Sequence, residues 1–272
     1  LDEEHEVIAY DLETTGLDPR DYGAGIRLAQ LGDHKQGWAI PWDHWSGIFI
    51  EAIERLKRRK VRLVAHNASF DNRWLRMFAN WEIPYELIDD TMIMAQVCEP
   101  DLPAGLKSLS DRHVDRRASY MQKTLDNAMK EQGWGWDTVP VNFEIYWQYG
   151  AVDCVITVHL WYHYKDDIEK YKVAYDLEMN ARRVVSAMED NGVRIDMEYC
   201  ERMLTELKGW VEESKEWAKE NWGVNIGSGP QVVDLFQNRL GQTIDRKTAS
   251  GSPSADKEQM AVFAASEDPT IA

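Results

Sequence analysis

Two acidic residues, Asp11 and Glu13, lie in a segment that runs from Ile8 to Gly16 and has the pattern of a short strand entering a turn. Successive side chains of a strand point to opposite faces, so Asp11 and Glu13 share one face. Two neighbouring carboxylates repel each other, and a divalent cation between them removes the repulsion. Oxygen ligands favour Mg²⁺ or Mn²⁺. The alternative is a surface strand end with two solvated acids.

Two later segments carry further acids. A short apolar strand leads into Asn67 and then Asp71, which falls in the first turn of the next expected helix. The helix dipole favours an acid there, so helix capping is the alternative to a ligand role. Tyr149 and Asp153 are four residues apart in a long helical stretch and therefore lie on one face of it. An ordinary surface pair is the alternative.

The elements that must position these side chains follow from hydrophobic periodicity and turn residues. Strands are expected over residues 6–14, 26–32, 37–42, 62–66 and 86–89, and helices over 48–60, 69–80 and 91–97. The helix over 48–60 has Ile48, Ala52, Ile53 and Leu56 on one face. A hairpin meander followed by strand–helix alternation predicts an α/β fold with a mixed five-stranded sheet flanked by helices.

The rest of the chain is expected to be mainly helical. Helices are predicted over residues 106–113, 117–131, 142–172, 173–189 and 197–222, with a short helix from 228 to 240 and a last one from about 254. We place a domain boundary between residues 172 and 173.

The acids and the tyrosine together resemble the three exonuclease motifs of the DnaQ-like superfamily, in its DEDDy branch. Asp11-x-Glu13, Asn67-x-x-x-Asp71 and Tyr149-x-x-x-Asp153 occur in the order of that family, over roughly residues 6–172. The related branch has a histidine five residues before the last aspartate, where this sequence has Gln148. The resemblance implies an RNase H-like fold and hydrolysis of phosphodiester bonds with two Mg²⁺ or Mn²⁺ ions per site.

The resemblance also implies roles for the individual residues. Asp11 would bridge the two metals, and Glu13 and Asp153 would complete the site that activates water. Asp71 would hold the second metal through water molecules. Tyr149 would orient the attacking water together with Glu13.

Three further residues match family positions that contact the nucleic acid strand. Leu17 matches an apolar wedge against the terminal bases, and Asn67 and Phe70 match positions lining the strand pocket. For Phe70, plain packing in the core is the alternative.

Residues 174–272 are similar to the segment that opens the polymerase domain of family A DNA polymerases. The similarity rests on the helix end Asn191-Gly192-Val193, on Ser228-Gly229-Pro230-Gln231, and on the loop that follows. The palm and fingers motifs do not occur in the sequence. We therefore expect a 3′–5′ exonuclease domain in residues 1–172 and an incomplete thumb base in residues 173–272. Its expected partners are single-stranded DNA 3′ ends and the remainder of a polymerase, in the same chain or in a separate subunit.

Composition restricts the remaining possibilities. The net charge of −16 argues against broad non-specific gripping of duplex DNA, which needs a basic surface. No apolar run is long enough for a bilayer, the acidic N-terminus is unlike a signal peptide, and the three cysteines lack paired spacing. We expect a cytoplasmic protein, in the host cytoplasm if it comes from a bacteriophage. The missing initiator methionine indicates a fragment.

Two other functions are consistent with the same motifs. A DEDDy exoribonuclease similar to ribonuclease D would use the same acids on RNA. A non-catalytic scaffold domain of a polymerase would keep the fold, but such domains lose the acids, which are all present here.

Overall fold

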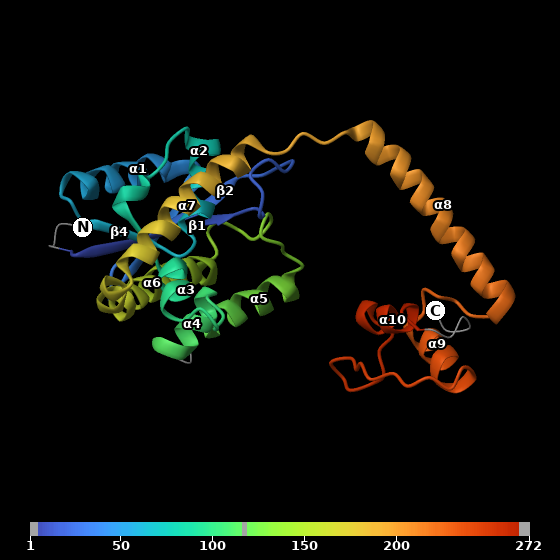
Figure 1. Cartoon of the computed structure of the whole chain (residues 1–272). Coiled ribbons are helices and arrows are strands. Elements are labelled where there is room, and N and C mark those ends of the chain that lie inside the picture. Colours follow the sequence, from blue (N-terminus) through green and yellow to red (C-terminus); the bar gives the residue numbers. More distant parts are fainter. Residues whose placement is uncertain (1–4, 116–118, 267–272) are drawn as a thin grey trace. The chain divides into compact units, whose positions relative to one another are not determined.

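The computed structural model describes residues 5–115 and 119–266. By its internal contacts the chain forms two compact units, residues 1–192 and 193–272 (Figure 1). Among the described residues, no helix is both long and apolar enough to cross a bilayer.

The first unit is built on a five-stranded sheet with the order β3-β2-β1-β4-β5. Its strands are β1 (Val7–Thr14), β2 (Ile26–Gly32), β3 (Gly37–Pro41), β4 (Arg62–Ala65) and β5 (Ile88–Asp90). β1, β4 and β5 are parallel, whereas β2 is antiparallel to both β1 and β3. This is the mixed five-stranded sheet that the sequence predicts. The last strand begins at Ile88 because residues 85–87 form a 3₁₀ turn after Pro84.

Seven helices of this unit are described. They are α1 (Trp42–Arg58), α2 (Ala68–Ala79), α3 (Thr91–Cys98), α4 (Leu106–His113), α5 (Tyr120–Gln132), α6 (Glu144–Lys170) and α7 (Lys172–Asn191). The start predicted for α5, residue 117, lies outside the described residues. α1 begins well before the predicted residue 48, and its buried face starts with Trp42 and Phe49. The expected core residue Ile48 is exposed, because Phe49 occupies the inward position.

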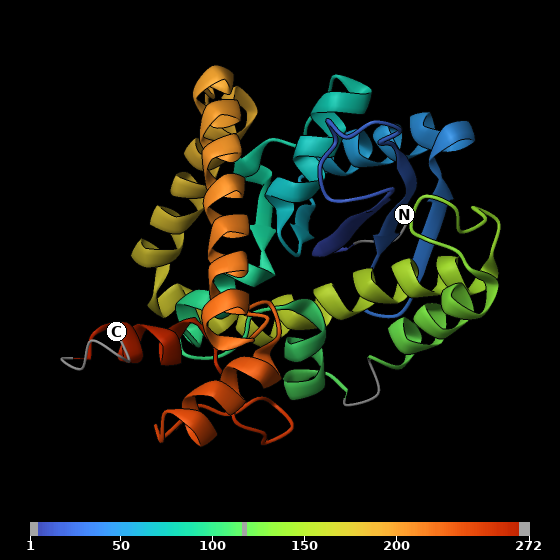
Figure 2. The ribbon, with the colours of Figure 1, turned by 90° about the vertical axis from the view of Figure 1, so that its right-hand side faces the viewer.

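Each face of the sheet has its own apolar core. Alternate residues of β1, such as Ile8 and Leu12, pack with α1 and α2. Val7 and Ala9 pack on the other face with α3 and α6. Figure 2 shows α1 and α2 on one side of the sheet and α6 on the other. The alternation therefore turns Asp11 toward α6.

Helix α7 belongs to the first unit. It contacts α2 and α3, and its Tyr175 is buried. The Tyr175 hydroxyl accepts a hydrogen bond from the amide of Asp90 at 3.0 Å and donates to Asp89 at 3.2 Å. The predicted domain boundary between residues 172 and 173 falls after the first residue of α7, and the compact unit continues beyond it to Gly192.

The second unit contains α8 (Met197–Trp222), α9 (Gly229–Asp234), a π-helical turn (Leu235–Arg239) and α10 (Lys257–Ala264). Its core includes Val224, Phe236 and Phe263, and the two phenylalanine rings stack at a centroid distance of 4.3 Å. α8 has exposed apolar side chains, among them Leu207, Trp210 and Trp217.

Glycines allow α6 to approach the sheet closely. A Cβ at Gly32 of β2 would lie 2.7 Å from the Cβ of Cys154, and a Cβ at Gly37 of β3 would collide with the carbonyl oxygen of Ala151. Because Ala151 and Cys154 flank Asp153 in the helix, this close packing fixes the height of Asp153 above the sheet.

We expect Gly37→Ala to lower the free energy of unfolding by about 1–3 kcal/mol, because the new methyl group meets backbone atoms that cannot move aside. Gly47→Ala is the matched control, since Gly47 lies within α1 with open space around its Cα. This control should stabilise the protein by about 0.5–1 kcal/mol. Urea unfolding followed by tryptophan fluorescence measures both. Equal stability of Gly37→Ala and the unmodified protein would contradict the close-packing argument.

Candidate active site

Four of the five predicted catalytic side chains meet in one pocket between β1, α4 and α6. The pocket has a volume of about 390 Å³ and is lined by Asp11, Glu13, Tyr149 and Asp153. Asp11 is partly exposed to it, whereas Glu13 and Asp153 are buried. Strand and helix periodicities place Asp11 with Glu13 and Tyr149 with Asp153, and the resemblance to the exonuclease motifs implies that the two pairs meet.

Asp71 reaches the same region from the opposite face of the sheet. Its carboxylate accepts a hydrogen bond from the backbone amide of Leu12 at 3.1 Å, between the two acids of β1. Asp71 is fully buried, in the first turn of α2. The capping alternative therefore does not describe its main contact, which is to β1.

The start of α2 is held by a residue that the sequence analysis does not identify. The carboxylate of Asp90, at the end of β5, accepts hydrogen bonds from the amides of Asn67 at 3.0 Å and Ala68 at 2.9 Å. Asn67 has the left-handed conformation, with φ 71° and ψ 50°, and turns the chain from β4 into α2. Its own side chain makes no capping bond. Asp90 thus positions Asp71 through the backbone.

The carboxylates perturb one another strongly. Burial and the neighbouring Asp153 raise the pKa of Asp11 to about 7. Burial, followed by the charges of Asp11 and Asp153, raises the pKa of Glu13 well above its usual value. Burial also raises the pKa values of Asp71 and Asp153. Crowded carboxylates that resist ionisation are the donor set expected for bound divalent cations, which would remove the repulsion.

Tyr149 completes this wall of the pocket. It lies one helical turn from Asp153 in α6 and lines the same pocket. Burial and the charge of Asp153 raise the pKa of Tyr149, so the phenol stays protonated at physiological pH. Gln148, which replaces the histidine of the related branch, is exposed and donates a hydrogen bond to Glu144 at 2.9 Å. It does not line the pocket.

Lys107 is the main residue of the pocket that the sequence analysis misses. Its ammonium pairs with Asp153 and lies 4.6 Å from the centre of the Tyr149 ring. Its distance of more than 40 residues from Asp153 in sequence gives no periodic signal that could link them. The only sequence hint is that Lys107 is the second residue of the helix predicted over residues 106–113, shortly after the Pro100–Pro103 break.

The three predicted strand-binding residues lie outside the acid pocket. Leu17 is 84% exposed in the loop after β1. Phe70 packs against the core, with its ring 6.1 Å from that of Trp74. The Asn67 side chain accepts a hydrogen bond from Arg182 at 2.8 Å. Only Leu17 is fully available to a ligand.

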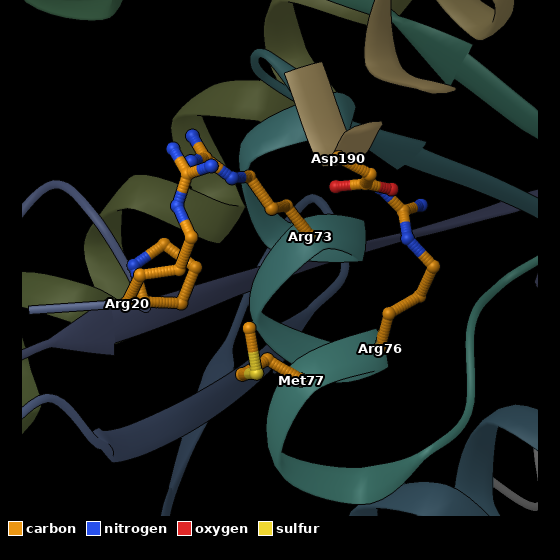
Figure 3. Close-up of a pocket in the computed structure, with 6 residues that line it drawn as sticks. Arg20, Arg73, Arg76, Met77 and Asp190 are labelled. Carbon is orange, nitrogen blue, oxygen red and sulfur yellow. The ribbon is translucent and has the colours of Figure 1, made fainter. Parts of the chain in front are cut away.

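A second hollow, of about 230 Å³, lies beside the Leu17 loop and is rich in arginine (Figure 3). Arg73 and Arg76 reach it from α2, and Arg20 reaches it from the loop. Arg73 donates to Asp18 at 3.1 Å and thereby ties the loop to α2. Arg76 pairs with Asp190 at 2.7 Å. The loop that carries Leu17 is therefore anchored at the residue following it.

A separate group of possible metal ligands, Glu99, His113 and His163, lies at the far end of α4. The Glu99 carboxylate already accepts hydrogen bonds from Arg112 and Tyr164, each at 3.0 Å. It also lies 2.7 Å from the imidazole of His113. These contacts explain the cluster as an ion-pair network.

The sequence of this chain is similar to those of known nuclease and polymerase proteins. The family model described as 3′-5′ exonuclease, of DNA polymerase A, matches residues 1–169. The DNA polymerase of Mycobacterium phage D29 is 24% identical over 279 residues, covering 92% of this chain and 44% of that protein. DNA polymerase I of Synechocystis is 27% identical over 255 residues, covering 88% and 25% respectively. The chain thus spans less than half the length of these curated relatives.

One solved structure supports the fold. The POL domain of Pol1 from M. smegmatis, in complex with DNA primer-template and dNTP, aligns with a TM-score of 0.60 and 15% identity. The alignment covers 94% of this chain and 40% of that one. At this identity the similarity concerns the fold alone.

We expect divalent metal to stabilise the protein more at about pH 8 than at about pH 5.5. The pKa of Asp11 is raised from 3.8 to about 7 in the folded state, so its ionised form destabilises the fold. This penalty is complete above pH 7 and disappears as the pH falls, because the folded protein then takes up the proton. Metal must displace that proton at low pH, so its apparent affinity at about pH 5.5 should be roughly 30-fold weaker than at about pH 8.

Thermal melting with and without Mg²⁺ or Mn²⁺ at the two pH values measures this effect. Calorimetric titration in buffers of different ionisation enthalpy counts the protons released. Equal stabilisation at both pH values, with no proton release, would contradict a metal site built on Asp11.

Proposed function

Because this chain belongs to the family of 3′–5′ exonuclease domains of family A DNA polymerases, we propose that it removes nucleotides from single-stranded DNA 3′ ends in the pocket between β1 and α6. The observation that carries the proposal is the convergence of four carboxylates and a protonated tyrosine on one site, from elements far apart in sequence. Exonucleases of this family act with divalent metal ions. The finer assignment of Mg²⁺ or Mn²⁺, two per site, is part of the proposal.

The residues present fit such a pair of ions, because the site holds more buried carboxylates than nearby cations. Asp11 would contact both ions, Glu13 and Asp153 would complete the first position, and Asp71 would hold the second through water. Bound ions stabilise negative charge on the attacking and leaving oxygens of a phosphodiester. Tyr149 orients the attacking water. Because the pKa of Tyr149 is raised, its phenol donates a hydrogen bond to that water without losing its proton.

We assign the approach of the strand to the loop after β1, which carries Leu17 outside the acid pocket. Leu17 would wedge against the terminal bases with its exposed apolar side chain. The contact of Asp18 with Arg73 holds the Leu17 loop in place. Asn67 and Phe70 would line the strand beyond it. Arg182, which holds the Asn67 side chain, would orient that amide.

The larger assembly is also a proposal. The curated relatives are DNA polymerases more than twice as long as this chain. We propose that residues 173–272 form the base of a polymerase thumb and pack against the remainder of the polymerase, in the same chain or as a subunit. The exposed apolar side chains of α8 support such packing. Phage and bacterial relatives favour action in the cytoplasm.

We predict that Asp11→Ala lowers exonuclease turnover by roughly a thousand-fold or more, because the bridging carboxylate is lost. Degradation of a labelled single-stranded oligonucleotide in Mg²⁺ or Mn²⁺ measures it. Asp21→Ala is the control, an exposed acid of the β1–β2 loop outside the pocket. Circular dichroism should show an intact fold for both variants. Full activity of Asp11→Ala would contradict the assignment of the acid pocket as the exonuclease site. Inactivity of the unmodified protein would favour the alternative of a non-catalytic scaffold domain.

Matched DNA and RNA oligonucleotides of one sequence separate the proposed function from a ribonuclease D-like exoribonuclease. We expect single-stranded DNA to be degraded at least about 10-fold faster than RNA, a difference of about 1.4 kcal/mol in the activation barrier. Faster degradation of RNA would show that the exoribonuclease alternative is right.

A further inference from the structure

Lys107 holds a position in the acid pocket that no catalytic assignment uses. Among the described residues that line the pocket, it is the only basic side chain. Its ammonium pairs with Asp153 and lies over the ring of Tyr149, so it contacts two of the five proposed catalytic residues at once. The Lys107 side chain is only 21% exposed, so this placement is a packed feature of the pocket.

The backbone around Lys107 presents further positive potential to the pocket. α4 begins at Leu106, and Gly105, Leu106, Lys107 and Ser108 all line the pocket. No side chain caps the start of α4. The positive end of the helix and the ammonium therefore face the same cavity.

Charge balance indicates what the ammonium can do. Three carboxylates, those of Asp11, Glu13 and Asp153, line the pocket with one ammonium, and Lys107 compensates Asp153. The fourth carboxylate, that of Asp71, accepts a hydrogen bond from the amide between the two acids of β1. Two divalent cations would balance the four carboxylates, and the ammonium would then be in excess by one positive charge. A phosphodiester linkage carries one negative charge, and this charge increases on its oxygens during hydrolysis.

We propose that Lys107 is a catalytic residue whose ammonium changes partner, from the carboxylate of Asp153 to the scissile phosphate. In the structure its ammonium is paired with Asp153. When Asp153 binds metal, the ammonium turns to a non-bridging oxygen of the scissile phosphodiester. A lysine suits this exchange because its ammonium has three donors on a flexible stem. The inference rests on the proposed function of this pocket.

The ammonium acts without giving up a proton. A water oxygen bonds to phosphorus while the bond between phosphorus and the 3′ oxygen of the penultimate nucleotide breaks. That 3′ oxygen takes a proton from solvent, and the proton lost by the attacking water goes to solvent. Lys107 holds the charge that accumulates on the non-bridging oxygen.

The exchange predicts two effects of opposite sign for Lys107→Met. Turnover on single-stranded DNA should fall by about 10- to 100-fold, because a charge that stabilises the transition state is lost. Binding of Mn²⁺ to the free protein should become tighter by about 3- to 10-fold, because no ammonium competes for Asp153. Calorimetry or the Mn²⁺ electron paramagnetic resonance signal measures binding independently of activity.

Two further variants control the test. Lys107→Arg keeps the charge and should retain turnover within about 10-fold of the unmodified protein. Lys130→Met removes an exposed lysine of α5 outside the pocket and should change neither turnover nor Mn²⁺ binding. Weaker or unchanged Mn²⁺ binding in Lys107→Met would overturn the exchange, and so would unchanged turnover.

A modified oligonucleotide tests contact with the phosphate directly. In Ca²⁺, Lys107→Met should bind a normal oligonucleotide about 10-fold more weakly than the unmodified protein does. When the terminal linkage is a neutral methylphosphonate, Lys107→Met and the unmodified protein should bind the oligonucleotide with equal affinity. The same loss with both oligonucleotides would overturn the contact.

Asp11→Ala separates this inference from the proposed function. If Asp11→Ala is inactive and Lys107→Met behaves like the unmodified protein, only the role of Lys107 fails. If Asp11→Ala is fully active, the site itself is wrongly assigned.

Discussion

Mutual repulsion among four crowded carboxylates, three of them buried, is the constraint on which the first unit of this protein depends. Burial and neighbouring charge raise the pKa of Asp11 to about 7 and oppose ionisation of Glu13, Asp71 and Asp153 as well. A fold selected for stability alone would not gather these groups. The surrounding elements must therefore hold the carboxylates together against their own repulsion, which a bound cation would reduce.

Rigid backbone packing keeps the carboxylates in place. Glycines of β2 and β3 let α6 lie close above the sheet, which sets the height of Asp153. The amide of Leu12 binds Asp71 across the edge of β1, so the strand that carries two acids also fixes a third. Asp90 in turn fixes the start of α2 through two backbone amides. Each carboxylate is thus placed by backbone geometry, which a local charge cannot easily distort.

The sequence predicted what local periodicity determines. Alternation along β1 placed Asp11 and Glu13 on one face, and helical spacing placed Tyr149 beside Asp153. Contacts between distant segments carry no such period. The pairing of Lys107 with Asp153, the support of α2 by Asp90 and the packing of α7 on the first unit could not be predicted for that reason. At α1 the error was local, since two adjacent apolar residues, Ile48 and Phe49, competed for one inward position.

The net charge of −16 and an anionic substrate are compatible if positive charge is concentrated where the strand passes. Lys107 and the start of α4 face the acid pocket, while Arg20, Arg73 and Arg76 surround the hollow beside the Leu17 loop. Each of these arginines has an acidic partner nearby, so the hollow is polar and nearly balanced in charge. Such a surface gives little long-range attraction for duplex DNA. In the proposed function, recognition would depend on the one strand end that reaches the acid pocket, where bound divalent cations would supply positive charge.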